Sequence, residues 1–168
     1  SAIEPDCQIV TAPAAVFTTE AAVKAAYESG KLNRDVIIIL RAQGPMANGM
    51  PELHSLTPIL DTLQDRGHKV MLVTDGRMSG ASGRVPAAIH ITPEAMNGGG
   101  IGRINDGDLI TLDATMGLLS VDADLEDRDF TVAPVADGAF GRALFADMRD
   151  YAAPAEQGGG INMLRRYS

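Results

Sequence analysis

This sequence of 168 residues has one cysteine, no tryptophan and no long apolar run, and each of these features excludes a class of protein or site. The single cysteine, Cys7, rules out an internal disulfide and any metal site made only of cysteines within the chain. Tryptophan is absent and aromatic residues make up 4%, which excludes an aromatic platform that stacks nucleic-acid bases. No apolar run approaches the length of a membrane-spanning helix.

Basic residues are also scarce. Fourteen lysines and arginines against 22 acidic residues give a net charge of −8. Because this charge repels phosphate groups, we expect neither nucleic acid nor an anionic membrane surface as a partner. The sequence opens without a charged and then apolar leader, so we expect a cytoplasmic protein. Apolar residues, at 45%, are plentiful enough for a buried core, and the length suits a single domain.

The most informative stretch begins as a strand and continues as a polar loop. Residues 70–73 are four consecutive apolar residues, too few for a helix, and predict a buried strand. The polar loop that follows could be only a tight surface turn. Glycine, however, lets backbone N–H groups approach a ligand closely, and glycine-rich loops after buried strands bind anions in α/β folds. We therefore predict a binding site in residues 74–83, where three glycines separate five polar residues: Thr74, Asp75, Arg77, Ser79 and Ser82.

Helices and strands alternate along the first half of the chain, which favours an α/β fold. Helices are predicted over residues 21–28, 57–64 and 138–152, the first with Thr18 or Thr19 as its N-cap. Strands are predicted over residues 36–40, 70–73, 85–92, 101–104, 108–113 and 118–121. Because the later strands are short, we expect a mixed, barrel-like sheet with flanking helices. Residues 1–13 are expected to form a linker or an edge strand, and residues 154–168 a tail.

Residues 43–54, 74–83 and 85–95 resemble the C-terminal domain of the dihydroxy-acid and 6-phosphogluconate dehydratase family. The first of these segments and the Ser-Gly-Ala-Ser-Gly form of the loop are more similar to the 6-phosphogluconate branch. The resemblance implies a swivelling β/β/α-type domain of a longer hydro-lyase, which dehydrates 6-phospho-D-gluconate to 2-dehydro-3-deoxy-6-phosphogluconate and water in the Entner-Doudoroff pathway. A dehydratase of another sugar acid or dihydroxy acid, or a non-catalytic module that binds a sugar-acid phosphate, stays open as an alternative.

The same resemblance implies partners and a cofactor that this chain does not contain. In the full-length enzyme we expect a 4Fe–4S cluster whose ligands lie in an N-terminal domain, and we expect that enzyme to be a homodimer. No metal ligand is expected in this chain, because its one cysteine cannot hold a cluster. The 168-residue chain alone is therefore expected to be inactive.

The resemblance gives Ser79 the role of the base that removes a proton from the substrate. A serine needs nearby positive charge and hydrogen-bond donors for this task, and on composition alone Ser79 would be read as a turn hydroxyl. Asp75 is expected to brace the loop. Met46 stands where that branch often has a lysine, which removes one candidate phosphate partner. The residues expected to bind substrate are Asn48, Gly49, Met50, Arg77, Ser82, Arg84 and His90.

Both candidate loops leave strands that the sequence predicts. Residues 43–50 follow the strand over residues 36–40, and residues 74–83 follow the strand over residues 70–73. Each strand has an apolar body and a polar end. We therefore expect the two loops to lie at the same edge of the sheet.

Overall fold

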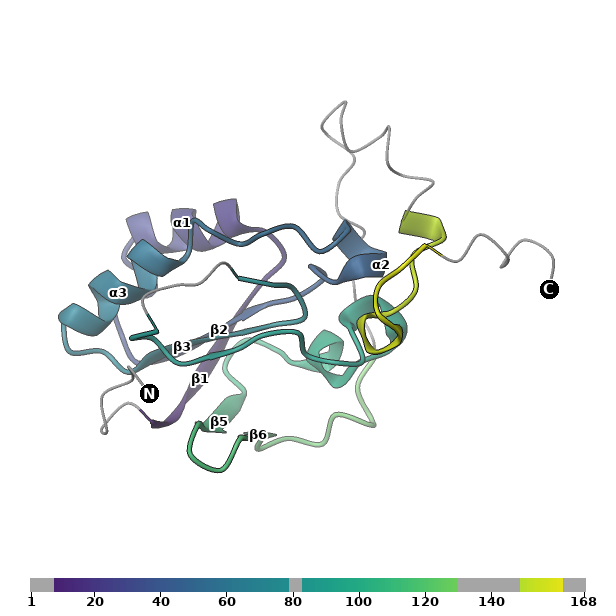
Figure 1. Cartoon of the computed structure of the whole chain (residues 1–168). Helices are drawn as coiled ribbons and strands as arrows, with labels where there is room; N and C mark the ends of the chain where they lie inside the picture. Colours follow the sequence, from purple (N-terminus) through teal and green to yellow (C-terminus); the bar gives the residue numbers. More distant parts are fainter. Residues whose placement is uncertain (1–7, 79–82, 130–148, 162–168) are drawn as a thin grey trace.

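Six strands form one mixed sheet in the order β4-β3-β2-β1-β5-β6, in a computed structural model that describes residues 8–78, 83–129 and 149–161 (Figure 1). β5 runs antiparallel to β1, and β6 runs antiparallel to β5. Figure 1 shows β5 and β6 turning below the other strands, so the sheet curls into a half-barrel. The predicted α/β domain with a mixed, curled sheet is confirmed. The strands are β1 (Ile9–Phe17), β2 (Val36–Leu40), β3 (Val70–Thr74) and β4 (Ala87–Ala88), which are parallel, and β5 (Leu109–Asp113) and β6 (Leu118–Val121).

β1 joins the parallel and antiparallel halves of this sheet. Residues 9–13 pair with β5, and residues 14–17 pair with β2. Residues 9–13, expected to form a linker or an edge strand, are the first part of this nine-residue strand and pair with β5. Pro13 suggested an edge, because proline cannot donate to a strand ladder. The strand accommodates Pro13 where its pairing passes from β5 to β2.

Two helices, α1 (Glu20–Glu28) and α3 (Thr57–Asp65), cover one face of the parallel strands (Figure 1). Thr19 caps α1, since its hydroxyl oxygen accepts a hydrogen bond from the backbone N of Ala22 at 3.2 Å. Both helices were predicted from the sequence, the first with Thr18 or Thr19 as its N-cap. No helix among the described residues is long and apolar enough to cross a membrane.

Shorter helical turns occur in the rest of the described chain, in one place where a strand was predicted. α2 (Pro45–Asn48) is a single turn within the first candidate loop. The 3-10 turn η3 (Gly100–Arg103) replaces a predicted strand, because Gly100 and Gly102 flank Ile101 and glycine disfavours strands. Two further 3-10 turns are η2 (Ala95–Asn97) and η4 (Ala155–Gln157). The strand predicted over residues 85–92 is reduced to the two residues of β4. The helix predicted over residues 138–152 lies mostly outside the described residues.

β2 is buried on both faces, as its uninterrupted apolar sequence predicts. Val36, Ile38 and Leu40 belong to a core cluster with residues of α1 and α3. Ile37 and Ile39 belong to a second cluster with residues of β5, η2 and η3. The sheet therefore separates a layer covered by helices from a layer closed by its own antiparallel strands.

Candidate functional site

The loops that follow β2 and β3 meet at one edge of the sheet. The two strands are parallel neighbours, and their last residues, Leu40 and Thr74, are paired in register. Asp75, directly after β3, accepts hydrogen bonds from the backbone N of Ala42 at 3.1 Å and of Gln43 at 2.9 Å, just after β2. The prediction that both loops lie at the same edge is confirmed. This is the edge of an α/β sheet at which ligands usually bind.

Asp75 is fully buried and ties three segments together. Besides the two hydrogen bonds from the β2 loop, its Oδ2 accepts a bond from the backbone N of Ala95 in η2, at 2.9 Å. Burial raises the pKa of Asp75, and the backbone hydrogen bonds oppose that rise because they favour the ionised carboxylate. These contacts are those of a loop brace.

Glu94 is a second buried carboxyl group at this edge, and sequence reasoning missed it. Its Oε1 accepts a hydrogen bond from the backbone N of Met46 at 3.1 Å, and its Oε2 accepts one from Ala47 at 3.2 Å. Gly44 makes room for the carboxylate, since a Cβ there would lie 2.3 Å from Oε2. Burial raises the pKa of Glu94, and the negative charge of Asp75 adds to the rise. Because these partners are backbone groups 47 and 48 residues away, no local sequence signal identifies Glu94.

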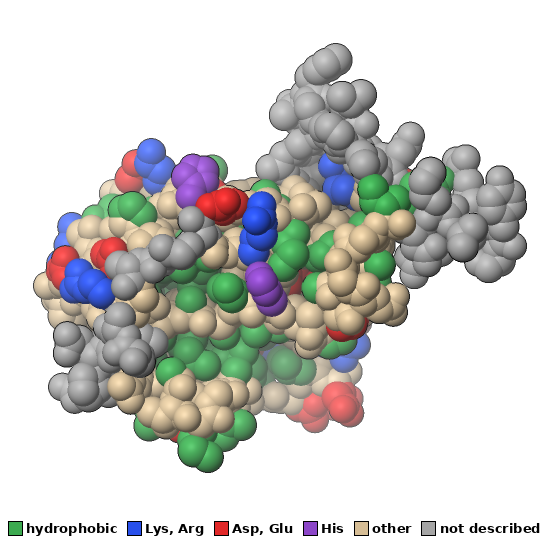
Figure 2. All heavy atoms as spheres, in the orientation of Figure 1, with side chains coloured by type: hydrophobic (Ala, Val, Ile, Leu, Met, Phe, Trp, Pro, Cys, Tyr) green, Lys and Arg blue, Asp and Glu red, His purple; other side chains and the backbone are tan. Residues whose placement is uncertain are grey.

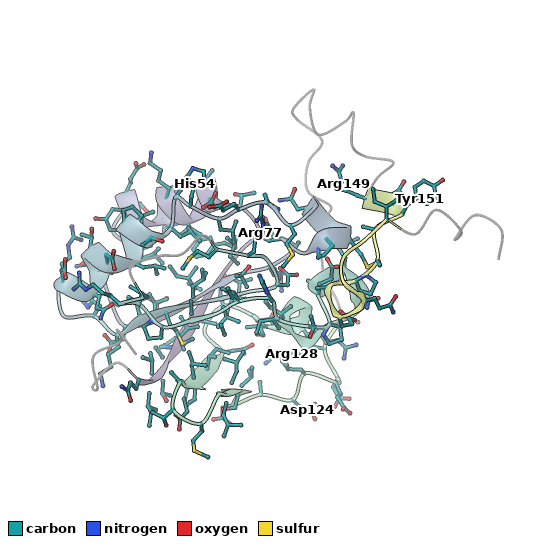
Figure 3. The ribbon with its side chains drawn as sticks, in the orientation of Figure 1. His54, Arg77, Asp124, Arg128, Arg149 and Tyr151 are labelled. Carbon is teal, nitrogen blue, oxygen red and sulfur yellow. The ribbon has the colours of Figure 1, made fainter. Side chains whose placement is uncertain are left out.

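Arg77 links the two loops on the exposed side of this edge (Figure 3). Its Nε donates a hydrogen bond to the carbonyl oxygen of Met50 at 2.9 Å. Its own carbonyl oxygen accepts a bond from the backbone N of Leu53 at 3.0 Å. The side-chain bond holds the guanidinium group of Arg77 beside the first loop. In the sequence, Arg77 lies two residues before Ser79.

Met50 and His90 both adopt the left-handed backbone conformation that non-glycine residues rarely take, with φ values of 53° and 56°. The backbone N of Met50 donates to the carbonyl oxygen of Gly44 at 3.2 Å, and that of His90 donates to Gly76 at 3.0 Å. Residues held in this conformation are concentrated at binding and catalytic sites. The strain, which the sequence does not reveal, supports both as candidate site residues.

Asn48 and Gly49 complete the first loop. The Nδ2 of Asn48 donates to the Oε1 of Gln43 at 2.9 Å, and Gly49 ends α2 in the left-handed conformation with a φ of 69°. Figure 2 shows basic and histidine side chains beside apolar surface on this face of the molecule. The structure therefore brings five of the residues expected to bind substrate to one edge: Asn48, Gly49, Met50, Arg77 and His90.

Arg84 does not lie at this edge. Its Nη2 donates to the Oδ1 of Asp65, at the end of α3, at 2.8 Å. Residue 84 precedes β4, which runs parallel to β3, so it lies where these strands begin and not where they end. The substrate-binding role expected for Arg84 stays a prediction, which this placement does not support. Ser79 and Ser82 lie outside the described residues.

A 4Fe–4S cluster does not fit the residues of this chain. Such a cluster is normally held by four cysteine thiolates, and the sequence has one cysteine, Cys7, which lies outside the described residues. Among the residues that the structure describes, no group of three or more His, Cys, Asp or Glu is placed to hold a metal ion. A cluster in a longer protein would need ligands from the rest of that protein.

Comparisons with known proteins agree on one family. Residues 1–159 match the family described as "Dihydroxy-acid/6-phosphogluconate dehydratase C-terminal". The phosphogluconate dehydratase of Pseudomonas aeruginosa is 53% identical over 163 residues, and that of Escherichia coli K12 is 45% identical over 163 residues. Each of these two alignments covers 94% of this chain and 27% of the relative. The dihydroxy-acid dehydratase of Acetivibrio thermocellus is 39% identical over 123 residues, 73% of this chain and 22% of that protein.

The chain thus spans about a quarter of the length of the curated relatives it matches. The family match covers nearly the whole chain, including both loops at the candidate site. This chain therefore belongs to the dihydroxy-acid/6-phosphogluconate dehydratase family and corresponds to the C-terminal domain of its members.

Proposed function

We propose that this chain is the C-terminal domain of a hydro-lyase that dehydrates 6-phospho-D-gluconate to 2-dehydro-3-deoxy-6-phosphogluconate and water. The observation that carries the proposal is the junction of the two loops, where Arg77 is bonded to Met50. The choice of substrate is supported by relatives named phosphogluconate dehydratase at 45% to 53% identity, against 39% for a dihydroxy-acid dehydratase.

The reaction removes a proton from C2 and the hydroxyl group from C3, and the resulting enol tautomerises to a 2-keto acid. Ser79 is the proposed base at C2. Its hydroxyl is a weak acid, so its alkoxide needs a cation nearby, and the guanidinium of Arg77 is two residues away in the chain. Asp75 and Glu94 are unsuited to this role, because both are buried and their oxygens accept backbone hydrogen bonds. The departure of the C3 hydroxyl is not assigned to a residue of this chain.

Substrate binding is proposed for the loop residues at the same edge. Arg77 suits the carboxylate of a sugar acid, because a guanidinium group forms two parallel hydrogen bonds to a carboxylate. Asn48, Gly49, Met50 and His90 are proposed to surround the sugar chain. Ser82 is proposed to hydrogen-bond the substrate or to shape the loop.

The rest of the active site is proposed to come from the part of the enzyme that precedes this domain. That part would hold the 4Fe–4S cluster, and the assembled cytoplasmic enzyme is proposed to be a homodimer. The family match and the single cysteine of the chain support a cluster held outside this domain. It explains why the 168-residue chain alone is expected to be colourless and inactive.

The test measures turnover by the full-length, cofactor-loaded enzyme with 6-phosphogluconate and with a branched-chain 2,3-dihydroxy acid. We expect kcat/KM for 6-phosphogluconate to be at least about 100-fold higher, a difference of roughly 2.7 kcal/mol in transition-state binding. A preference for the dihydroxy acid would assign the chain to the other branch of the family. Tight binding of 6-phosphogluconate by the loaded enzyme without turnover would instead indicate a non-catalytic module.

A further inference from the structure

The single-turn helix α2, within the first loop of the candidate site, begins without a capping side chain of its own. The first N–H groups of a helix have no partner inside it, and a side chain just before the helix usually accepts their hydrogen bonds. The residue before α2 is Gly44, which has no side chain that could do so. A helix of one turn is also unstable by itself. The formation of α2 therefore depends on contacts from elsewhere in the chain.

Glu94 supplies the missing acceptor. The helix starts with a proline, which has no N–H group, and the N–H group of its last residue donates to the carbonyl oxygen of Gly44 at 3.0 Å. The two N–H groups that remain belong to Met46 and Ala47. Both donate to the carboxylate of Glu94, at 3.1 and 3.2 Å. One side chain from a distant part of the sequence thus completes the hydrogen bonds at the start of α2.

Glu94 itself is held in a fixed place. Its carbonyl oxygen accepts hydrogen bonds from the backbone N of Asn97 at 2.9 Å and of Gly99 at 3.0 Å. The next residue, Ala95, donates its N–H group to Asp75 at 2.9 Å. The side chain of Glu94 is fully buried, so it acts on α2 from beneath the surface. Its carboxylate therefore fixes α2 relative to the loop that follows β3.

The first loop, residues 43–50, is thus held at three points. Asp75 bonds to its start and Arg77 to its end, and both come from the loop after β3. Glu94 holds the middle, at α2. The N–H groups of residues 48–50 donate to carbonyl oxygens at the start of the same turn, so their places depend on the turn staying formed.

We propose that Glu94 is a positioning residue for the substrate. By keeping α2 formed, it places Asn48, Gly49 and Met50, the residues assigned above to the sugar chain, and it does not touch the substrate itself. The inference rests on the proposed function, because it concerns the same site. Without Glu94, only the fraction of molecules in which α2 is formed binds substrate, and the apparent affinity falls by that fraction.

The experiment compares three variants that disturb this contact, Glu94→Ala, Glu94→Gln and Gly44→Ala, in the full-length, cofactor-loaded enzyme. Gly44 has a φ of −67° and a ψ of 177°, which alanine adopts readily. The three atoms nearest to an added Cβ all belong to Glu94, with its Oε2 at 2.3 Å. Gly44→Ala therefore displaces the carboxylate from the N–H groups of α2 without removing it.

Asp35→Asn is the matched control. The carboxylate of Asp35 also accepts a hydrogen bond from a distant backbone group, the N–H of Lys69, at 2.9 Å. It lies just before β2, at the end of the strands opposite the candidate site. The quantities measured are kcat and KM for 6-phosphogluconate and the inhibition constant of D-gluconate. Amide hydrogen exchange of residues 48–50 is measured as well, without ligand.

In Glu94→Ala and Gly44→Ala we expect KM and the inhibition constant of D-gluconate to rise together by about 10-fold, which corresponds to α2 formed in about a tenth of the molecules. The kcat stays within about twofold, because saturating substrate draws the enzyme into the state with α2 formed. The amides of residues 48–50 exchange faster, since their hydrogen bonds open more often. Glu94→Gln keeps one acceptor oxygen and gives intermediate values, and Asp35→Asn changes none of them.

A merely structural role for Glu94 gives the opposite pattern, with kcat lowered because less enzyme is folded and KM unchanged. That pattern would overturn the proposal, and so would unchanged exchange of residues 48–50 in the variants. If Glu94→Ala does not fold, the same readings on Gly44→Ala and Glu94→Gln decide. Failure of the proposed function looks different, because the wild-type enzyme itself would not turn over 6-phosphogluconate. The assignment to this substrate would then fall, and hydrogen exchange would still decide whether Glu94 holds α2.

Discussion

The parallel and antiparallel halves of the sheet bury their residues in different ways. In the parallel half, every residue of β2 and β3 is buried. In the antiparallel half, β5 alternates between buried and more exposed residues, and no residue of β6 is buried. Two apolar side chains there, Met116 and Leu118, are 70% and 61% exposed. The candidate site lies at the end of the half that is buried on both faces.

The carboxylates of the two halves differ in the same way. In the parallel half, burial raises the pKa of Asp75. In the antiparallel half, hydrogen bonds from Arg128 lower the pKa of Asp108, and the hydroxyl and backbone of Thr115 lower that of Asp113. The loops at the site are therefore positioned by acidic groups that are costly to ionise, whereas the other half uses carboxylates that are readily ionised. Asp75 and Glu94 therefore hold the loops in place through backbone hydrogen bonds, although burial disfavours their ionised forms.

The largest difference between the halves is expected for Asp75→Ala against Asp113→Ala. Asp75→Ala leaves three buried backbone N–H groups without their acceptor, at about 1–3 kcal/mol each, so we expect a loss of at least about 3 kcal/mol in the free energy of unfolding. Asp113 also accepts backbone hydrogen bonds, from residues 115 and 116, but at the exposed surface where water replaces it. Urea unfolding of the two variants measures the difference. Equal losses would show that burial does not distinguish the halves.

The next largest effect concerns catalysis and compares two serines of the loop after β3. Ser79→Ala in the full-length enzyme should lower kcat by a factor of about 10² to 10⁴, the loss typical of a missing general base. The fold and substrate affinity should change little, because one oxygen is removed from a loop. Ser82→Ala should cost less, since water can replace part of a positioning hydroxyl. Near-normal kcat in Ser79→Ala with loss of activity in Ser82→Ala would transfer the role of base to Ser82.

The features that the sequence predicted are those set by neighbouring residues. The uninterrupted apolar run of β2 predicts a strand buried on both faces, and Thr19 predicts the start of α1. The shared edge of the two loops follows once β2 and β3 are parallel neighbours. These inferences need only periodicity, capping and the direction of parallel strands.

The features that the sequence did not predict depend on distant parts of the chain. Glu94 contacts backbone groups 47 and 48 residues away. The position of Arg84, away from the two loops, depends on the direction of the two-residue strand β4. The role of β1 was missed because its neighbours, β2 and β5, are separated from each other by a long stretch of the described chain. In each case the interaction is one of tertiary pairing, for which a single sequence carries no local signal.

A smaller effect concerns the pH dependence of stability. Burial raises the pKa of Asp75 and Glu94 above the ordinary values near 4. Between about pH 4 and the raised pKa values, the folded state therefore binds more protons than the unfolded state. The free energy of unfolding falls as pH rises through this window. Asp108 has a lowered pKa, so the stability it contributes is present above the ordinary value and is lost as pH falls below it.

The measurement is urea unfolding between about pH 2 and pH 7. Asp75→Asn should flatten the decline of stability above about pH 4, whereas Asp108→Asn should flatten the decline below it. The slope is the readout, because each substitution also changes the absolute stability. The contrast between the halves would fail if both variants altered the same limb of the pH profile.

The smallest effect is expected for Leu118→Ala in β6, compared with Leu60→Ala in α3. Leu60 is fully buried in the cluster beneath the helices, so its truncation should cost about 2–5 kcal/mol of unfolding free energy. Leu118 is mostly exposed, and its truncation should change that energy by no more than about 0.5 kcal/mol in the 168-residue chain. Urea unfolding at two protein concentrations is the measurement. A loss above about 1.5 kcal/mol for Leu118→Ala that grows with protein concentration would mean that a second copy of the chain covers β6. Truncation would then remove contacts between copies, which the exposed side chain does not make in a single chain.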